Sequence, residues 1–326
     1  MFSVTNNRGF VPQSEQFEDR EMVGEDIQAY KVIEKGDFAY NPARINVGSI
    51  AKYEGNGKCM ISSLYVCFNT IDRIDRDWFM HLLKTPKMNF YYNLNGEGGV
   101  RVYLFYPNFA RIRSSYPSLA EQKKIAAMLS LIDERIATQS KIIEEQETLL
   151  KSLRESLLKQ CSKSSVSCKI GDILTIRSGK DYQHLENGDI PVYGTGGLMC
   201  HVNNFLHDGE SVCIGRKGTI NKPLYLNGKF WPVDTLFYTH SFKGVLPRYC
   251  YHLFCTIDWL TYNEASGVPS LSKSTIEKIS VVIPSIKIQE LTVQALDSVE
   301  QKIDIDRNVL LGYQQQKEYL LSRMFI

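Results

Sequence analysis

Residues 121–160 carry the pattern that most restricts how this chain can fold. Apolar side chains recur there at alternating steps of four and three, and the segment contains no glycine or proline. The seam positions are Ile125, Leu129, Ile132, Ile136, Ile143, Leu150, Leu153 and Leu157, with Gln139 and Gln146 as polar members. Such spacing predicts a helix of roughly 60 Å whose narrow apolar stripe needs a partner helix. A capping box at Ser118 and Glu121 marks its start.

The C-terminal residues repeat this pattern and are the predicted partner. A shift of 167 residues matches Pro117 with Pro284 and Gln122 with Gln289, without a gap. Most of the shifted seam positions remain apolar, and those assigned to the second seam are Leu296, Val299, Ile303, Leu310 and Leu320. Two seams in register indicate an internal duplication. We expect the two long helices to pack as an antiparallel coiled coil.

The segments that precede the two helices also resemble each other, although more loosely. Short strand-like runs separated by Gly or Asn turns dominate both, which predicts two mixed α/β domains in an α+β chain. The predicted order is a first domain (1–117), a first helix (118–160), a second domain (161–287, opening with the hydrophilic linker 161–168) and a second helix (288–326).

Two polar loops at matching places in the halves are candidate DNA-contacting segments. The loop at 40–49 offers Asn41, Arg44, Asn46 and Ser49, and the loop at 214–219 offers Arg216, Lys217 and Thr219. Arginine, asparagine and threonine contact base edges and phosphates, and glycine lets a backbone approach closely. A polar turn is the ordinary interpretation of one such loop, but equivalent placement in both halves favours DNA contact.

Glycine-rich polar segments at 190–197 and 265–273 extend this candidate set. The second is matched in the first half by residues 96–101. The residues that they add are Arg101, Tyr193, Thr195, Ser270, Ser272 and Lys273, and Lys180 beside Gly179 joins them. Successive backbone N–H groups in such segments favour phosphate. These residues are therefore predicted to contact DNA together with the two loops.

No motif in the chain predicts catalysis. A nucleotide-binding G-x-x-x-x-G-K-[ST] loop and a G-x-G-x-x-G loop are both missing, and Asn41-Pro42 lacks the aromatic residue of the amino-methyltransferase motif. The six histidines show no metal-ligand spacing, so no metal site is predicted, and the eight cysteines form no C-x-x-C pair. Reduced thiols, together with no signal peptide and no run of about 18 apolar residues, predict a cytoplasmic protein without a membrane span.

The duplicated helices, with the stretches at 40–50 and 215–220, resemble the specificity subunit of a type I restriction-modification system. The resemblance covers nearly the whole chain. It implies two target-recognition domains that each read one half of a split double-stranded DNA sequence, and helices that space the half-sites and dock two modification subunits. Those methyltransferase subunits would bring S-adenosylmethionine, and restriction subunits would add cleavage with ATP and Mg²⁺. No cofactor is expected in this chain.

The first half departs from this pattern at its beginning. The second half opens with Lys169–Ile176, interpreted as a first strand, and the first half has no counterpart. The first domain is therefore expected to be shortened at its N-terminus.

Two functions of other classes remain open. A coiled-coil scaffolding protein without DNA binding would explain the seams but not the duplicated loops. A self-sufficient enzyme would need a catalytic motif that the chain lacks. The net charge of +2 decides nothing, because it is too small to indicate a nucleic-acid partner.

Overall fold

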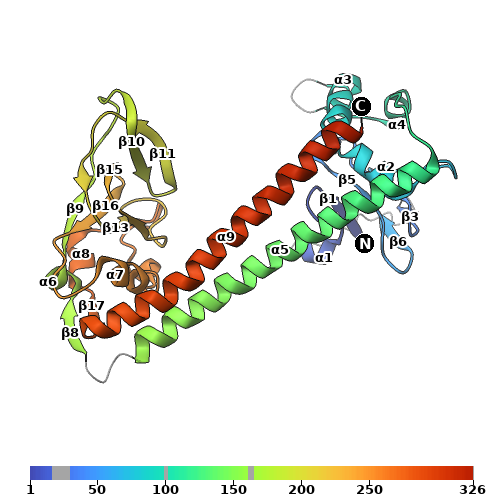
Figure 1. Cartoon of the computed structure of the whole chain (residues 1–326). Coiled ribbons are helices and arrows are strands. Elements are labelled where there is room, and N and C mark those ends of the chain that lie inside the picture. The colour runs from blue at the N-terminus through green and yellow to red at the C-terminus, as the bar shows by residue number, and fades with distance from the viewer. Residues whose placement is uncertain (17–29, 99–101, 161–164, 326) are drawn as a thin grey trace. The chain divides into compact units, whose positions relative to one another are not determined.

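A computed structural model describes residues 1–16, 30–98, 102–160 and 165–325 of the chain (Figure 1). Contacts group the chain into two compact units: unit 1 holds residues 1–140 and 309–326, and unit 2 holds residues 141–308. This grouping cuts through both long helices, so the four predicted domain ranges remain a prediction. Among the described residues, no helix combines the length and the apolar character needed to span a membrane.

The two long helices are α5 (Leu119–Gln160) and α9 (Ile286–Met324). The predicted capping box precedes α5: the Ser118 amide donates to the Glu121 carboxylate at 3.1 Å, and the Glu121 amide donates to the Ser118 hydroxyl at 3.4 Å. Two orphan donors at the helix start are satisfied in this way. The helix therefore begins where the sequence predicts.

Within unit 1, the segments of α5 and α9 run side by side in opposite directions (Figure 1). Asp133 on α5 forms an ion pair with Lys317 on α9. Two residues further along α5, the guanidinium of Arg135 lies 5.8 Å from the ring centre of Tyr313. The residue number rises on one helix while it falls on the other, which is the antiparallel arrangement.

Unit 2 shows the same arrangement. The Gln146 amide nitrogen donates to the Asp306 carboxylate at 2.8 Å, and further along α5 Arg154 forms an ion pair with Glu300. The predicted α+β class with two long antiparallel helices is thereby confirmed. The polar pair Gln146–Asp306 lies among apolar seam positions, and a polar layer of this kind favours one register of the two helices.

Every predicted seam residue is at least half-buried. The buried ones are Leu129, Ile132, Ile143, Leu150, Leu296 and Ile303. The half-buried ones are Ile125, Ile136, Leu153, Leu157, Val299, Leu310 and Leu320. The stripe therefore faces inward along both helices, as expected for a segment whose apolar side is covered.

Two small sheets and four helices make up the domain of unit 1 within its described residues. One sheet has the order β2 (Gly9–Pro12), β1 (Phe2–Thr5), β6 (Cys59–Ile61) and β3 (Lys31–Ile33), and the other has β5 (Ile50–Lys52), β4 (Phe38–Tyr40) and β7 (Val66–Phe68). The helices are α1 (Gln13–Gln16), α2 (Arg76–Leu83), α3 (Pro86–Asn95) and α4 (Tyr106–Phe109). Phe38, Tyr40, Trp78 and Tyr92 are the largest side chains of its main core.

Three sheets form most of the domain of unit 2. Their strand orders are β11 (Gly197–Val202), β10 (Asn187–Gly194), β15 (Lys229–Pro232), β12 (His207–Asp208); β14 (Leu224–Leu226), β13 (Ser211–Gly215), β16 (Leu236–His240), β9 (Thr175–Ser178); and β17 (Ser280–Ile283), β8 (Val166–Lys169). The helices are α6 (Ile170–Ile173), α7 (Pro247–Phe254) and α8 (Lys273–Lys278). Tyr249, Phe254 and Trp259 are the largest buried side chains of its main core.

One predicted strand of unit 2 is wrong. Residues 169–176 do not form a single strand, because α6 occupies Ile170–Ile173. The Lys169 amide donates to the Asp172 carboxylate at 2.9 Å, which stabilises the first turn of this short helix. Alternating apolar residues in so short a run do not distinguish a strand from a helical turn.

A buried glutamine joins the domain of unit 1 to the start of α5. Gln122 is fully buried, and its Oε1 accepts from the amide of Asp75, the N-cap of α2, at 2.8 Å. Its Nε2 donates to the carbonyl oxygens of Arg73 at 3.1 Å and Pro117 at 2.9 Å. One side chain therefore satisfies three backbone groups that would otherwise lack partners.

Gln289 does the same in unit 2. Its Oε1 accepts from the amide of Leu246, the N-cap of α7, at 2.8 Å. Its Nε2 donates to the carbonyl oxygens of Gly244 at 3.0 Å and Pro284 at 2.8 Å. The two glutamines that the sequence matches therefore make the same set of bonds, which supports the duplication.

Gln289→Ala is expected to lower the free energy of unfolding of unit 2 by about 1–3 kcal/mol, because buried backbone groups lose their partner. Gln122→Ala should do the same in unit 1. Urea unfolding of the full chain measures both. Gln301→Ala is the matched control, since this glutamine is exposed on the same helix as Gln289. Equal stability of Gln289→Ala and Gln301→Ala would contradict the role of the buried glutamine.

Candidate nucleic-acid interface

In unit 2, residues 232–235, from the end of β15 to the start of β16, form backbone hydrogen bonds with loops from distant parts of the sequence. The Lys180 amide donates to the carbonyl oxygen of Pro232 at 3.0 Å, which holds the segment after β9. The Val233 amide donates to the carbonyl oxygen of Tyr193 at 3.0 Å, which holds the end of β10. Lys180 and Tyr193 are thereby fixed beside the same turn.

The loop after β13 is bound to the same segment. The amides of Arg216 and Lys217 donate to the carbonyl oxygen of Thr235 at 2.8 and 3.3 Å. The guanidinium of Arg216 reaches the carbonyl oxygen of Asp234 at 3.4 Å and lies 6.0 Å from the ring centre of Phe237. The Arg216 side chain is exposed, so these contacts orient its guanidinium without burying it.

A fourth segment, 269–273, joins the loop after β13. The Gly218 amide donates to the carbonyl oxygen of Pro269 at 2.8 Å, and the Leu271 amide donates to that of Arg216 at 2.9 Å. Gly218 adopts a φ of 97°, in the left-handed region that side chains other than glycine rarely adopt. A Cβ at Gly218 would lie 3.5 Å from the hydroxyl of Thr195, so the turn after β10 also lies close.

These bonds collect most of the predicted DNA-contacting residues of the second half. The residues that lie in the joined loops are Lys180, Tyr193, Thr195, Arg216, Lys217, Thr219, Ser270 and Lys273. The four cationic side chains among them are exposed, and Tyr193, Thr195, Thr219 and Ser270 are half-buried. We call this set the cationic loop surface. Such a surface can bind an anionic polymer through phosphates while its polar groups contact base edges.

Two features of this surface were not predicted from the sequence. The gathering segment 232–235 was not singled out, although a proline and an aspartate between two apolar runs signal a turn. Arg177, exposed on β9, was also missed. Burial, followed by the nearby charges of Arg177, His207 and Lys273, lowers the pKa of His240.

The loop at 40–49 in unit 1 shares a left-handed glycine and a bond from a leucine amide with the loop after β13. Gly48 adopts a φ of 94° and its amide donates to the carbonyl oxygen of Ile45 at 2.9 Å. The Leu104 amide donates to the carbonyl oxygen of Pro42 at 3.0 Å, as Leu271 does to Arg216 in unit 2. Arg44 precedes the short 3-10 turn Ile45–Val47, and its side chain is exposed. The matched arginines are therefore both presented at the surface.

Two other polar residues of this loop form internal hydrogen bonds. Asn41 Oδ1 accepts from the Ala43 amide at 3.0 Å. The Asn46 side chain donates to Asn93 on α3 at 3.1 Å. Both side chains are half-buried, so each keeps part of its surface for a ligand while the bonds fix its orientation.

Two predicted contacts, Ser49 and Ser272, use their hydroxyl groups within the fold. Ser49 is 3% exposed and its hydroxyl donates to the carbonyl oxygen of Val4 at 2.7 Å, which gives it a structural role and argues against DNA contact. Ser272 is the N-cap of α8, and its hydroxyl accepts from the Thr275 amide at 3.2 Å. Arg101 lies outside the described residues.

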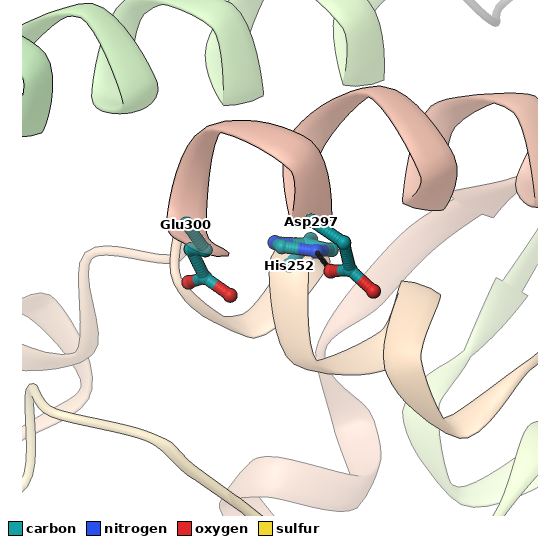
Figure 2. Close-up of side chains that lie close together, drawn as sticks. All are labelled: His252, Asp297 and Glu300. Carbon is teal, nitrogen blue, oxygen red and sulfur yellow. Dashed lines mark hydrogen bonds and ion pairs between the residues drawn. The ribbon is translucent and has the colours of Figure 1, made fainter. Parts of the chain in front are cut away.

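A separate charge cluster joins α7 to both long helices in unit 2. Figure 2 shows His252 of α7 between Asp297 and Glu300 of α9. Arg154 Nε of α5 donates to His252 Nδ1 at 3.2 Å. Because a guanidinium only donates, Nδ1 is unprotonated and Nε2 donates to Asp297 at 2.8 Å. Arg248 forms ion pairs with both carboxylates.

The side-chain atoms of this charge cluster that could bind a metal already have hydrogen-bond or ion-pair partners. Guanidinium groups hold both carboxylates, and Tyr251 donates to Glu300 at 3.0 Å. The arrangement therefore suits helix attachment better than metal binding. Burial lowers the pKa of His252. Below about pH 6.5 the unfolded chain takes up a proton that the folded chain does not, so this group destabilises the fold as the pH falls.

Comparisons with known proteins converge on one family. Residues 163–311 match the model of the type I restriction modification DNA specificity domain. A putative type I restriction enzyme specificity subunit, S.HindORF215P of Haemophilus influenzae, is 25% identical over 117 residues, which are 35% of this chain and 30% of that protein. The EcoprrI specificity subunit of Escherichia coli is 23% identical over 142 residues, 40% of this chain and 35% of that one.

Solved structures share the fold over most of the chain. The S subunit of a type I restriction-modification system from M. genitalium has a TM-score of 0.66 at 16% identity, covering 90% of this chain and 84% of that one. A chain from a study of complex assembly and conformational transition of the type I R-M system has a TM-score of 0.59 at 13% identity, covering 90% and 83%. The aligned part spans about a third of the length of the curated relatives.

Proposed function

We propose that this chain is a specificity subunit of a type I restriction-modification system, and that it recognises double-stranded DNA for such a complex without catalysing a reaction itself. The observation that carries the proposal is the cationic loop surface of unit 2. It lies within the residues that match the specificity domain and presents Lys180, Arg216 and Lys217 as exposed cations around one turn. Exposed cations fixed by backbone bonds suit phosphate contacts that position a duplex.

We further propose that the DNA site is bipartite. The similar loops at Arg44 and Arg216, each with a left-handed glycine and a bound leucine segment, support one reading loop in each half. Each loop would then contact one half-site. The helices α5 and α9 would space the half-sites.

The partners in this proposal are two modification subunits and restriction subunits. They would dock on the helices and bring S-adenosylmethionine, ATP and Mg²⁺, while this chain holds no cofactor. The chain would act in the cytoplasm and would not associate with a membrane. Copurification with a methyltransferase, followed by mapping of methylated sites in host DNA, tests this assembly and identifies the target sequence.

Arg216→Ala is expected to weaken binding to a duplex that carries the mapped site by about 1–3 kcal/mol if the guanidinium contacts a base. If it contacts a phosphate instead, binding should weaken on all sequences and the salt dependence should fall by about one charge. Arg44→Ala should show the same for the other half-site. Fluorescence anisotropy at several salt concentrations distinguishes these outcomes.

Lys141→Ala is the control for this experiment, since it removes an exposed cation from α5 rather than from a loop. Unchanged affinity and sequence preference in both arginine variants would show that these loops do not read DNA. Failure of the unaltered chain to bind any duplex at low salt would favour a scaffolding protein over a DNA-recognition subunit.

A further inference from the structure

Two adjoining cavities lie beside the Arg44 loop in unit 1. The larger, of about 540 Å³, has a mainly apolar wall made by Pro42, Leu64, Tyr103 and Phe105. The smaller, of about 240 Å³, has a polar wall that includes Thr5, Asn6 and Arg44. Ser3, Asn41 and Tyr65 line both. The two cavities therefore adjoin, one apolar and the other with a cation, and we call the pair the composite site.

The apolar end presents two aromatic rings that the core does not use. Tyr103 and Phe105 are stacked, with ring centroids 6.2 Å apart and an interplanar angle of 15°. Between them Leu104 is buried, and its amide donates to the carbonyl oxygen of Pro42 at 3.0 Å. Alternate residues of an extended segment point the same way, so anchoring Leu104 inward turns both rings outward. The rings are 39% and 48% exposed.

The cationic end presents polar groups with unused capacity. Arg44 is exposed and forms no ion pair with any described residue. Asn41 Oδ1 is held by the Ala43 amide, which leaves its Nδ2 free of partners among the described residues. A guanidinium beside an amide donor is suited to a phosphate group.

We infer that this composite site binds a single unstacked nucleotide, with its base against Tyr103 and Phe105 and its phosphate at Arg44. The size of the larger cavity falls within the range of small-molecule sites. Aromatic side chains bind unstacked bases of any identity by stacking, and arginine binds the phosphate. The inference rests on the proposed function, because the main source of this nucleotide would be a strand of bound DNA. A free mononucleotide is the other source of the same chemistry.

The test uses the full chain and two probes: a single-stranded dodecamer with a central 2-aminopurine, and dAMP. Saturable quenching of the 2-aminopurine emission is expected, because the base stacks on the rings. Phe105→Ala and Tyr103→Ala should each weaken oligonucleotide binding roughly 5- to 100-fold. Arg44→Ala should weaken it and lower the salt dependence by about one charge.

Phe90→Ala is the matched control, because Phe90 is 63% exposed on α3 and lines neither cavity. It should bind like the unaltered chain. If dAMP competes with the oligonucleotide and the same substitutions weaken its binding, the site also binds free nucleotides. If dAMP does not compete, the nucleotide comes from a strand. Absence of quenching, or unaltered binding in both Phe105→Ala and Tyr103→Ala, would overturn the inference.

Duplex binding by the unaltered chain, measured in parallel by anisotropy, separates this inference from the proposed function. Duplex binding without quenching of the single-stranded probe would overturn the nucleotide site and leave DNA recognition standing. Quenching without duplex binding would support the nucleotide site while removing the proposed function.

Discussion

Ile132→Asp is expected to lower the free energy of unfolding of unit 1 by about 3–5 kcal/mol and to release the proposed modification subunits. Ile132 is 7% exposed in the α5 seam. The substitution removes a buried apolar side chain and leaves a carboxylate in its place, and each change is costly. Urea unfolding of the full chain measures the stability, and copurification measures the assembly.

The neighbouring residue provides a matched control. Leu131 is 61% exposed on the same helix, so Leu131→Asp introduces the same charge outside the seam. Its effect on stability should stay within about 0.5 kcal/mol, as for most surface substitutions. Unchanged melting and retained partners in Ile132→Asp would refute the helical-pair arrangement.

Glu300→Ala is expected to destabilise unit 2 by about 3–5 kcal/mol, because it removes one partner of a largely buried charge cluster. Arg154 and Arg248 each form an ion pair with Glu300. Without the carboxylate, two guanidinium groups that are mostly buried lose the negative charge that balances their own. Thermal and urea unfolding at neutral pH measure the loss.

Glu290→Ala removes an exposed carboxylate from the same helix and serves as the control. A double-mutant cycle with Arg154→Ala isolates the interaction between Arg154 and Glu300. A Glu300→Ala variant as stable as Glu290→Ala would show that the cluster contributes nothing to attachment of α7. A coupling energy near zero would assign the loss to Arg248 instead.

The long helices could be predicted almost completely from the sequence. A heptad seam is a local pattern, and a capping box such as Ser118 with Glu121 specifies where the helix begins. The match of Gln122 with Gln289 is part of the duplication, but the sequence does not explain why both positions are glutamine. That reason appears only when α2 and α7 bring their N-caps to these side chains.

The candidate site was predicted in pieces. Arg216 and Lys273 were selected one loop at a time, and the turn at 232–235 that gathers the loops was missed. Ser49 looked equivalent to its polar neighbours, yet its hydroxyl is buried against β1. A loop residue that enters a strand can face either way, and the pairing of the strand decides which.

The sequence alone determined the duplication, the two long helices and the kinds of residue on the loops, because periodicity, caps and turn residues act over a few neighbouring positions. Only the tertiary structure decided which polar side chains face outward together. Lys180 and Arg216 are brought to one turn by the pairing of strands and by backbone bonds between distant segments. Such long-range pairings depend on the whole domain core, and no local pattern encodes them.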